Sequence, residues 1–104
     1  MPNLTMSIPH QLTQDEVKRR VQESIRQAQQ QYGHLVAKVE ERWDGYTLNM
    51  TVAAAGDTVS GQAIVELHEV QVSIALPWML SLLAGKVRRS IEQRGQQLLQ
   101  APTR

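Results

Sequence analysis

The sequence of 104 residues contains no cysteine. This absence excludes disulfide bonds, thiol nucleophiles and thiolate metal sites, and it fits a reducing compartment. Eleven Lys and Arg residues against ten Asp and Glu leave a formal net charge of only +1, which gives no indication of a nucleic-acid partner. A chain of this length can bury one core without a metal. We therefore expect residues 1–100 to form a single domain and residues 101–104 to form a frayed tail.

Long apolar runs and targeting signals are also missing. The longest apolar-rich run, Ile74 to Gly85, is shorter than the roughly 20 residues that span a bilayer, and it contains Pro77. The first ten residues lack the basic region and the apolar segment of a signal peptide. We expect a cytoplasmic protein without a transmembrane segment.

Residues 70–76 alternate apolar and polar side chains at the period of a half-buried strand. Pro77 ends this strand, and because proline is tolerated in the first turn of a helix, we expect it to start the next element. A helical wheel then predicts one core-facing stripe, made of Leu80, Leu83, Ala84, Val87, Ile91 and Leu98.

The first part of the chain predicts a strand over Leu4–Ile8, followed by a helix. Thr13 and Glu16 have the spacing of a capping box, and Leu12 and Val17 have that of a hydrophobic staple. Gly33 is expected to end this helix in the left-handed conformation.

Three further strands are predicted in the middle of the chain. The first runs over residues 35–43 and turns at Asp44-Gly45, so that Trp43 and Tyr46 would face each other across a hairpin. The second covers residues 46–52. After a turn at residues 53–57, the third covers residues 59–67.

This order, β-α-β-β-β-β-α, predicts an α+β fold with a five-stranded antiparallel sheet and two helices on one face. If the first strand pairs with the last, the strand order is 1-5-4-3-2. The sheet would then curl around the final helix in a small helix-grip-like arrangement, and Gly61 would ease the bend.

The sequence indicates no catalytic, metal or cofactor site. His10, His34 and His68 do not have the spacing that places two ligands on one face, and no glycine-rich phosphate loop or Ser/His/Asp set is present. All three histidines lie at predicted element ends, where we expect solvated turn residues. For His10, after a proline, we expect a structural hydrogen bond between the loop and the start of the helix.

One apolar patch falls opposite the core stripe of the final helix. It consists of Trp78, Met79 and Leu82, with Lys86 and Arg89 one or two turns further on. Such a combination can bind an apolar or lipid-covered surface. The same residues could instead pack against the first helix or the Trp43 hairpin, or form the seam of a homodimer.

Four segments give the chain a resemblance to a known family. They are the opening Ser7–Thr13, the W-D-G turn at Trp43–Gly45, the Ser60-Gly61 pair, and Val70–Pro77 leading into a basic helix. In their order and spacing they resemble the polyhydroxyalkanoic acid system proteins, small bacterial proteins associated with polyhydroxyalkanoate storage genes. The resemblance implies an accessory role at the granule or in synthesis, with no catalytic residues to carry over.

We therefore expect a non-enzymatic, granule-associated protein. Its partner would be the polyhydroxyalkanoate granule surface or a granule protein, bound through Trp78, Met79, Leu82, Lys86 and Arg89. Two alternatives remain open at this point. One is a helix-grip domain that binds a small apolar or acyl ligand, and the other is a homodimeric interaction module.

Overall fold

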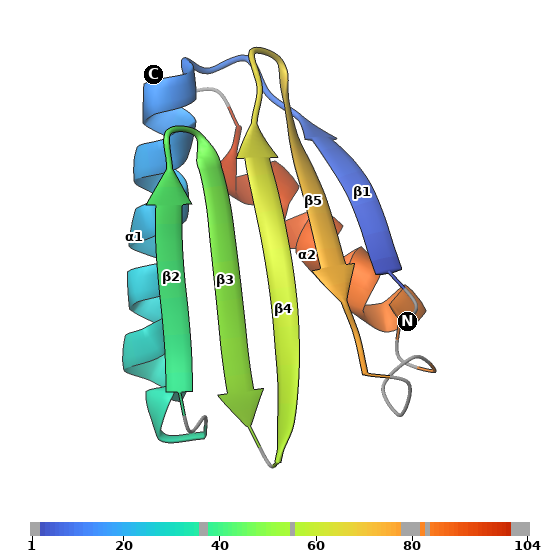
Figure 1. Ribbon diagram of the computed structural model, residues 1–104. Coiled ribbons are helices and arrows are strands. Elements are labelled where there is room, and N and C mark those ends of the chain that lie inside the picture. Colours follow the sequence, from blue (N-terminus) through green and yellow to red (C-terminus); the bar gives the residue numbers. More distant parts are fainter. Residues whose placement is uncertain (1–2, 36–37, 55, 78–81, 83, 101–104) are drawn as a thin grey trace.

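The computed structural model describes residues 3–35, 38–54, 56–77, 82 and 84–100 (Figure 1). Its elements follow the predicted order. The bounds are β1 Asn3–Pro9, α1 Gln14–Tyr32, a 3-10 helix η1 Gly33–Leu35, β2 Lys38–Asp44, β3 Thr47–Ala54, β4 Asp57–Val65, β5 Glu69–Ala75 and α2 Ala84–Leu98.

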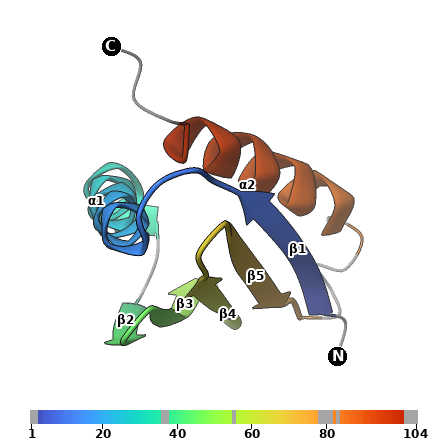
Figure 2. The same ribbon diagram turned by 90° about the horizontal axis from the view of Figure 1, so that it is seen from above.

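The five strands form one antiparallel sheet in the order β1-β5-β4-β3-β2, which confirms the α+β prediction. Both α-helices lie on the same face of the sheet, as Figure 2 shows from above. We call this face the inner face. Its side chains are largely apolar because each strand alternates apolar and polar residues.

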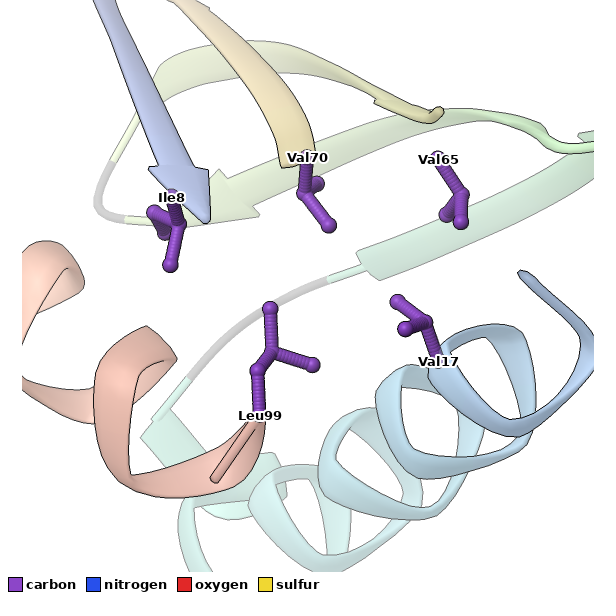
Figure 3. Packing of buried hydrophobic residues seen from close by; sticks show 5 residues of the cluster. All are labelled: Ile8, Val17, Val65, Val70 and Leu99. Carbon is purple, nitrogen blue, oxygen red and sulfur yellow. The ribbon is translucent and has the colours of Figure 1, made fainter. Parts of the chain in front are cut away.

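The main cluster of buried residues lies at one end of the inner face, which we call the closed end, while Leu4, Met6, Leu48 and Leu76 are buried further along the sheet. Ile8 stands opposite Val70, and Val70 stands opposite Val65, so three neighbouring strands contribute one row of side chains. Val17 of α1 and Leu99, directly after α2, pack onto this row (Figure 3). All five are buried. Burial of aliphatic side chains of this size stabilises the fold by about 1.5–3 kcal/mol each.

Polar contacts tie the helices to each other at the closed end. The Arg20 guanidinium donates to the carbonyl oxygens of Leu98 and Gln100, at 2.9 and 2.7 Å. It also donates to the Glu16 carboxylate at 2.8 Å. Because the last carbonyls of a helix have no intrahelical partner, Arg20 satisfies groups at the end of α2 that would otherwise depend on water.

The start of α1 follows the prediction, but its end does not. The Thr13 Oγ1 accepts from the Glu16 N–H at 3.1 Å, and Leu12 packs against the cluster that contains Val17. The prediction of a left-handed stop at Gly33 is wrong, since Gly33 has φ −58° and begins η1. Consequently Leu35 belongs to η1, and β2 starts at Lys38.

The predicted hairpin is also shifted. Asp44 pairs with Thr47, so Gly45 and Tyr46 form the turn and Trp43 stands opposite Leu48 rather than Tyr46. Gly45 has φ +61°, which suits the first central position of a hairpin turn. Contacts with α1 stabilise this turn, because the Lys18 Nζ donates to the Gly45 carbonyl at 2.9 Å and the Tyr46 hydroxyl donates to Asp15 at 2.6 Å.

Further boundaries differ from the sequence prediction. β3 runs to Ala54 and β4 begins at Asp57, so both strands extend into the predicted turn at residues 53–57. β4 ends at Val65, and Leu67 lies in the following turn with 68% of its surface exposed. The described part of α2 begins at Ala84. The first turns that we expected after Pro77 fall on residues 78–81 and 83, which lie outside the described residues.

Candidate functional site: an apolar hollow on the inner face

The two helices cover the two ends of the inner face unequally. In Figure 1, α1 and the end of α2 come together near the closed end, and the two helices diverge toward the end at which β3 turns into β4. The inner face is therefore hollowed at this second end, which we call the open end. Divergence of the two helices leaves this end of the inner face less covered.

The hollow at the open end has a volume of about 220 Å³ and is open to solvent on one side. We call it the apolar hollow. It spans the three central strands and is lined by Leu48, Met50, Val52, Val59, Gly61, Gln62, Ala63, Val72 and Ile74. The strand register aligns these residues in rows, because Met50 pairs with Gly61, and Gly61 pairs with Ile74.

Gly61 has no side chain, which leaves space in the row between Met50 and Ile74. A Cβ added at this position would lie in ordinary contact with the Ser73 carbonyl oxygen, at 3.6 Å, and with the Ile74 side chain, at 3.8 Å. A small side chain could therefore be accommodated, and it would fill part of the hollow. The lack of a side chain at Gly61 is thus not required by the backbone and enlarges the space between Met50 and Ile74.

A smaller hollow of about 150 Å³ adjoins the first one under the second half of α1. Met50 and Val52 line both hollows, so the apolar surface continues from the middle of the sheet to Ile25 and Ala28 of α1. The Ala28 side chain is exposed, and Ile25 is only partly buried. α1 thus carries apolar residues beyond the point at which it packs on the core.

The lining restricts the chemistry of the apolar hollow. Among the described residues that line it, Gln62 alone is polar, and its side chain lies on the outer face, where its amide donates to Asn49 Oδ1 at 3.2 Å. The other residues offer van der Waals contact and apolar surface that is released from water on binding. Such a surface can bind an alkyl chain, an apolar polymer or an apolar side chain of a partner.

Comparison with known protein families helps to choose among these classes of ligand. The family model "Putative polyhydroxyalkanoic acid system protein" matches residues 4–99, which is nearly the whole chain. The chain belongs to this family. No curated protein matches it. The family name connects the chain with the polyhydroxyalkanoate system, as the resemblance implied, and it leaves the binding residues to be inferred from the structure.

Of the predicted patch in this family member, the structure describes three residues. Leu82 has 94% of its surface exposed, and the Lys86 and Arg89 side chains are exposed as well. Trp78 and Met79 lie outside the described residues. Leu82 is not part of the lining of the apolar hollow. Within the described residues, neither helix is long and apolar enough to cross a membrane.

The histidines divide into one structural residue and two exposed ones. The His10 ring is buried, where Nδ1 accepts from the Leu12 N–H at 3.2 Å and Nε2 lies 2.9 Å from the Glu66 carbonyl oxygen. This confirms the expected structural bond at the start of the helix, although His10 is not the solvated residue that its position predicted. His34 and His68 are exposed. No group of three potential metal ligands occurs among the residues that the structure describes.

The apolar hollow was missed from the sequence because we expected both helices to cover the whole inner face. A signal was present in the second half of α1. Residues 27–31 read Q-A-Q-Q-Q, so Ala28 is the one apolar side chain in a stretch that should cover the sheet. A helix with such a weak apolar face covers little of the surface beneath it.

Proposed function

We propose that this chain is a non-enzymatic accessory protein of the polyhydroxyalkanoate storage system, and that it contacts the granule surface or a protein on it through the apolar hollow. The observation that carries the proposal is the uncovered, apolar open end of the inner face. A family whose name refers to polyhydroxyalkanoic acids supplies the context.

The chemistry of the two surfaces is compatible. A polyhydroxyalkanoate granule presents an aliphatic polyester, whose alkyl groups have no charges to pair. The hollow offers Met50, Val52, Val59 and Ile74 on neighbouring strands, all partly exposed. Contact would remove apolar surface on both sides from water, which contributes about 25 cal/mol for each Å² buried.

The shape of the hollow favours an extended surface over an enclosed ligand. Pockets that enclose a small molecule usually measure about 300–1,000 Å³ and bury most of its surface. The apolar hollow is smaller, at about 220 Å³, and open to solvent. These properties support contact with a polymer surface or an apolar side chain, and they give less support to a helix-grip domain that surrounds a free acyl chain.

The patch before α2 would provide a second contact. Leu82 is almost fully exposed, and Lys86 and Arg89 are available to bind ester carbonyl groups or acidic groups of a granule protein. β5 ends at Ala75, next to Ile74 of the hollow, so the chain leaves the open end of the sheet shortly before Leu82. We propose that Trp78 and Met79 belong to this second contact.

Co-sedimentation with granules tests the proposal. Purified protein is mixed with granules stripped of their proteins, with native granules, and with liposomes of the same surface area. We expect selective binding to stripped granules if the polymer is contacted directly. Binding to native granules alone would indicate a protein partner, and absence of binding to both would contradict the proposal.

Matched variants test whether the apolar hollow or the patch before α2 makes the contact with the granule. Val52 and Val59 face each other in the hollow, and replacing both by Thr changes polarity at nearly constant volume. Thr51 and Ser60 face each other on the outer surface of the same strands, and exchanging them is the control. We expect only the hollow variant to weaken binding. Replacing Trp78 and Leu82 by Ser tests the patch separately, and unchanged binding of that folded variant would remove the patch from the proposal.

A further inference from the structure

The sheet has two edges, and they differ in how their main-chain groups are satisfied. The His10 N–H donates to the His68 carbonyl at 2.9 Å, so residues 4, 6 and 8 of β1 direct their main-chain groups to β5 and residues 5, 7 and 9 direct theirs outward. On this outward side the Thr5 carbonyl accepts from Arg88 at 2.6 Å, and Pro9 has no N–H to donate. The β1 edge is thus poorly suited to pairing.

The β2 edge has no such protection within the described residues. The Tyr46 carbonyl accepts from the Val65 N–H at 2.9 Å, so the even-numbered residues of β3 face β4 and the odd-numbered ones face β2. Since Asp44 pairs with Thr47, the main-chain groups of Val39, Glu41 and Trp43 point to the edge. Figure 1 shows β2 at the border of the sheet.

The sequence of β2, K-V-E-E-R-W-D, is complementary to itself when read in the opposite direction. With a two-fold axis at Glu41, antiparallel pairing places Lys38 opposite Asp44 and Glu40 opposite Arg42. The same register places Val39 opposite Trp43. Both charged pairs are of opposite sign, and both lie on the outer face of the sheet, where Lys38, Glu40, Arg42 and Asp44 are exposed.

The register that matches the charges also matches the main chain. Antiparallel strands exchange two hydrogen bonds at alternate residue pairs. With the axis at Glu41, these pairs are Glu41 with Glu41 and Val39 with Trp43, which are the residues whose main-chain groups point to the edge. A shift of one residue would lose both the charge pairing and the hydrogen-bond pairing.

We propose that β2 is a self-association surface, through which a second copy of this chain pairs in antiparallel register about Glu41 and extends the sheet to ten strands. Charged residues on an edge strand usually prevent such pairing, but here their order makes like copies attract. In the monomer, Lys38 lies 3.1 Å from Glu40, and Arg42 and Asp44 form no ion pair among the described residues. The pairing gives Arg42 and Asp44 partners, and Lys38 and Glu40 exchange their contact with each other for contacts across the axis.

One like-charge contact lies on the axis itself. Glu41 is on the inner face, where its carboxylate accepts from the Trp43 Nε1 at 2.7 Å, and it would face the same residue of the second copy. Like charges directly opposite each other oppose pairing. Glu41 therefore limits the affinity, and Glu41→Gln, whose amide oxygen can still accept from Trp43, is expected to strengthen the dimer several-fold.

The dimer has a consequence for the proposed function, although the pairing itself does not depend on it. A two-fold axis perpendicular to the sheet keeps the inner faces of both copies on the same side. Two apolar hollows would then face one surface, and a second contact made by the same particle strengthens attachment without any new type of contact.

Sedimentation velocity on the purified full chain tests the pairing, because charge exchange predicts a distinctive pattern. We expect a concentration-dependent dimer for the wild type, and at least tenfold weaker dimers for Arg42→Glu and for Glu40→Arg. An equal mixture of these two single variants should restore a dimer, since each chain then supplies the opposite charges. The double variant Glu40→Arg, Arg42→Glu should also dimerise.

Arg94→Glu is the matched control, because Arg94 is exposed on α2 and the substitution changes the charge by the same amount. Its dimer should be as stable as that of the wild type. A wild type that stays monomeric at all concentrations would overturn the proposal. Single variants that dimerise as well as the wild type, or a mixture that does not regain the dimer, would also overturn it.

Discussion

The closed and open ends of the inner face share strands β4 and β5 and the same apolar residue types, yet they differ in what covers them. On β4, Val65 is buried under α1 and the end of α2, whereas Val59 lines the apolar hollow. Both valines point to the same face of one strand. The comparison teaches that apolar alternation makes a face available for packing, and that the paths of the helices decide which part becomes core.

Removing the His10 side chain should damage the closed end most. His10→Ala leaves the Glu66 carbonyl and the Leu12 N–H, both partly buried, without their present partner. Unsatisfied buried groups cost about 1–3 kcal/mol each, so we expect a loss of about 3 kcal/mol in the free energy of unfolding, measured by urea denaturation. His68→Ala, at an exposed histidine, is the control and should change stability little.

The same substitution at both ends measures the contrast directly. Val65→Ala removes two methyl groups from a buried site and should lower the free energy of unfolding by about 2.5 kcal/mol. Val59→Ala, at the open end, should lower it by less than about 1 kcal/mol, because part of the side chain is already in water. Equal losses for the two variants would mean that the open end is packed as tightly as the closed end.

Loosening the contact between the two helices should have a smaller effect. Arg20→Met keeps the aliphatic stem and removes the hydrogen bonds to the Leu98 and Gln100 carbonyls. Hydrogen bonds from charged groups contribute about 1.5–3 kcal/mol, and we expect a loss near the lower limit by thermal denaturation. Arg19→Met removes a more exposed partner of the same Glu16 and should change the stability much less, because exposed ion pairs are screened by solvent.

The smallest effect concerns pH. Hydrogen bonds from Arg19 and then Arg20 lower the pKa of Glu16 from 4.5 to about 2. A carboxyl group with a lowered pKa stabilises the folded state above its unfolded pKa. The stability difference between wild type and Glu16→Gln should therefore be complete above pH 4.5 and disappear as the pH falls through about 2. Added salt should reduce it, and a difference that persists at the lowest pH would contradict this assignment.

The element order and the strand pairing could be predicted from the sequence, whereas some boundaries could not. Period-two alternation and the Thr13 cap are local signals, and the structure confirms both predictions. The turn at Gly45 is different, because Lys18 and Asp15 of α1 bind residues of this turn. Local propensity for an Asp-Gly turn contains no information about these contacts. The 3-10 turn that begins at Gly33 is a second boundary that the sequence did not predict.

The candidate site was less accessible to sequence reasoning. Which residues face inward follows from alternation, and Met50, Val59 and Ile74 do line the inner face. Whether a helix covers them depends on the angle between the two helices, which the Arg20 contacts and the packing of Leu99 set at the closed end. The patch around Leu82 could be identified because its residues form one face of a predicted helix, and its role as a binding surface stays a prediction.

The central claim is our proposal that the open end of the inner face makes the contact with the granule, and its most direct form is contact with the polyester itself. Methyl NMR tests it most directly, with short hydroxyalkanoate oligoesters added to the labelled protein. The account predicts that methyl signals of Met50, Val52, Val59 and Ile74 shift, while those of Ile8, Val17 and Val65 at the closed end stay in place. Unchanged signals at the open end, with shifts confined to Leu82, would contradict the claim and place binding at the patch.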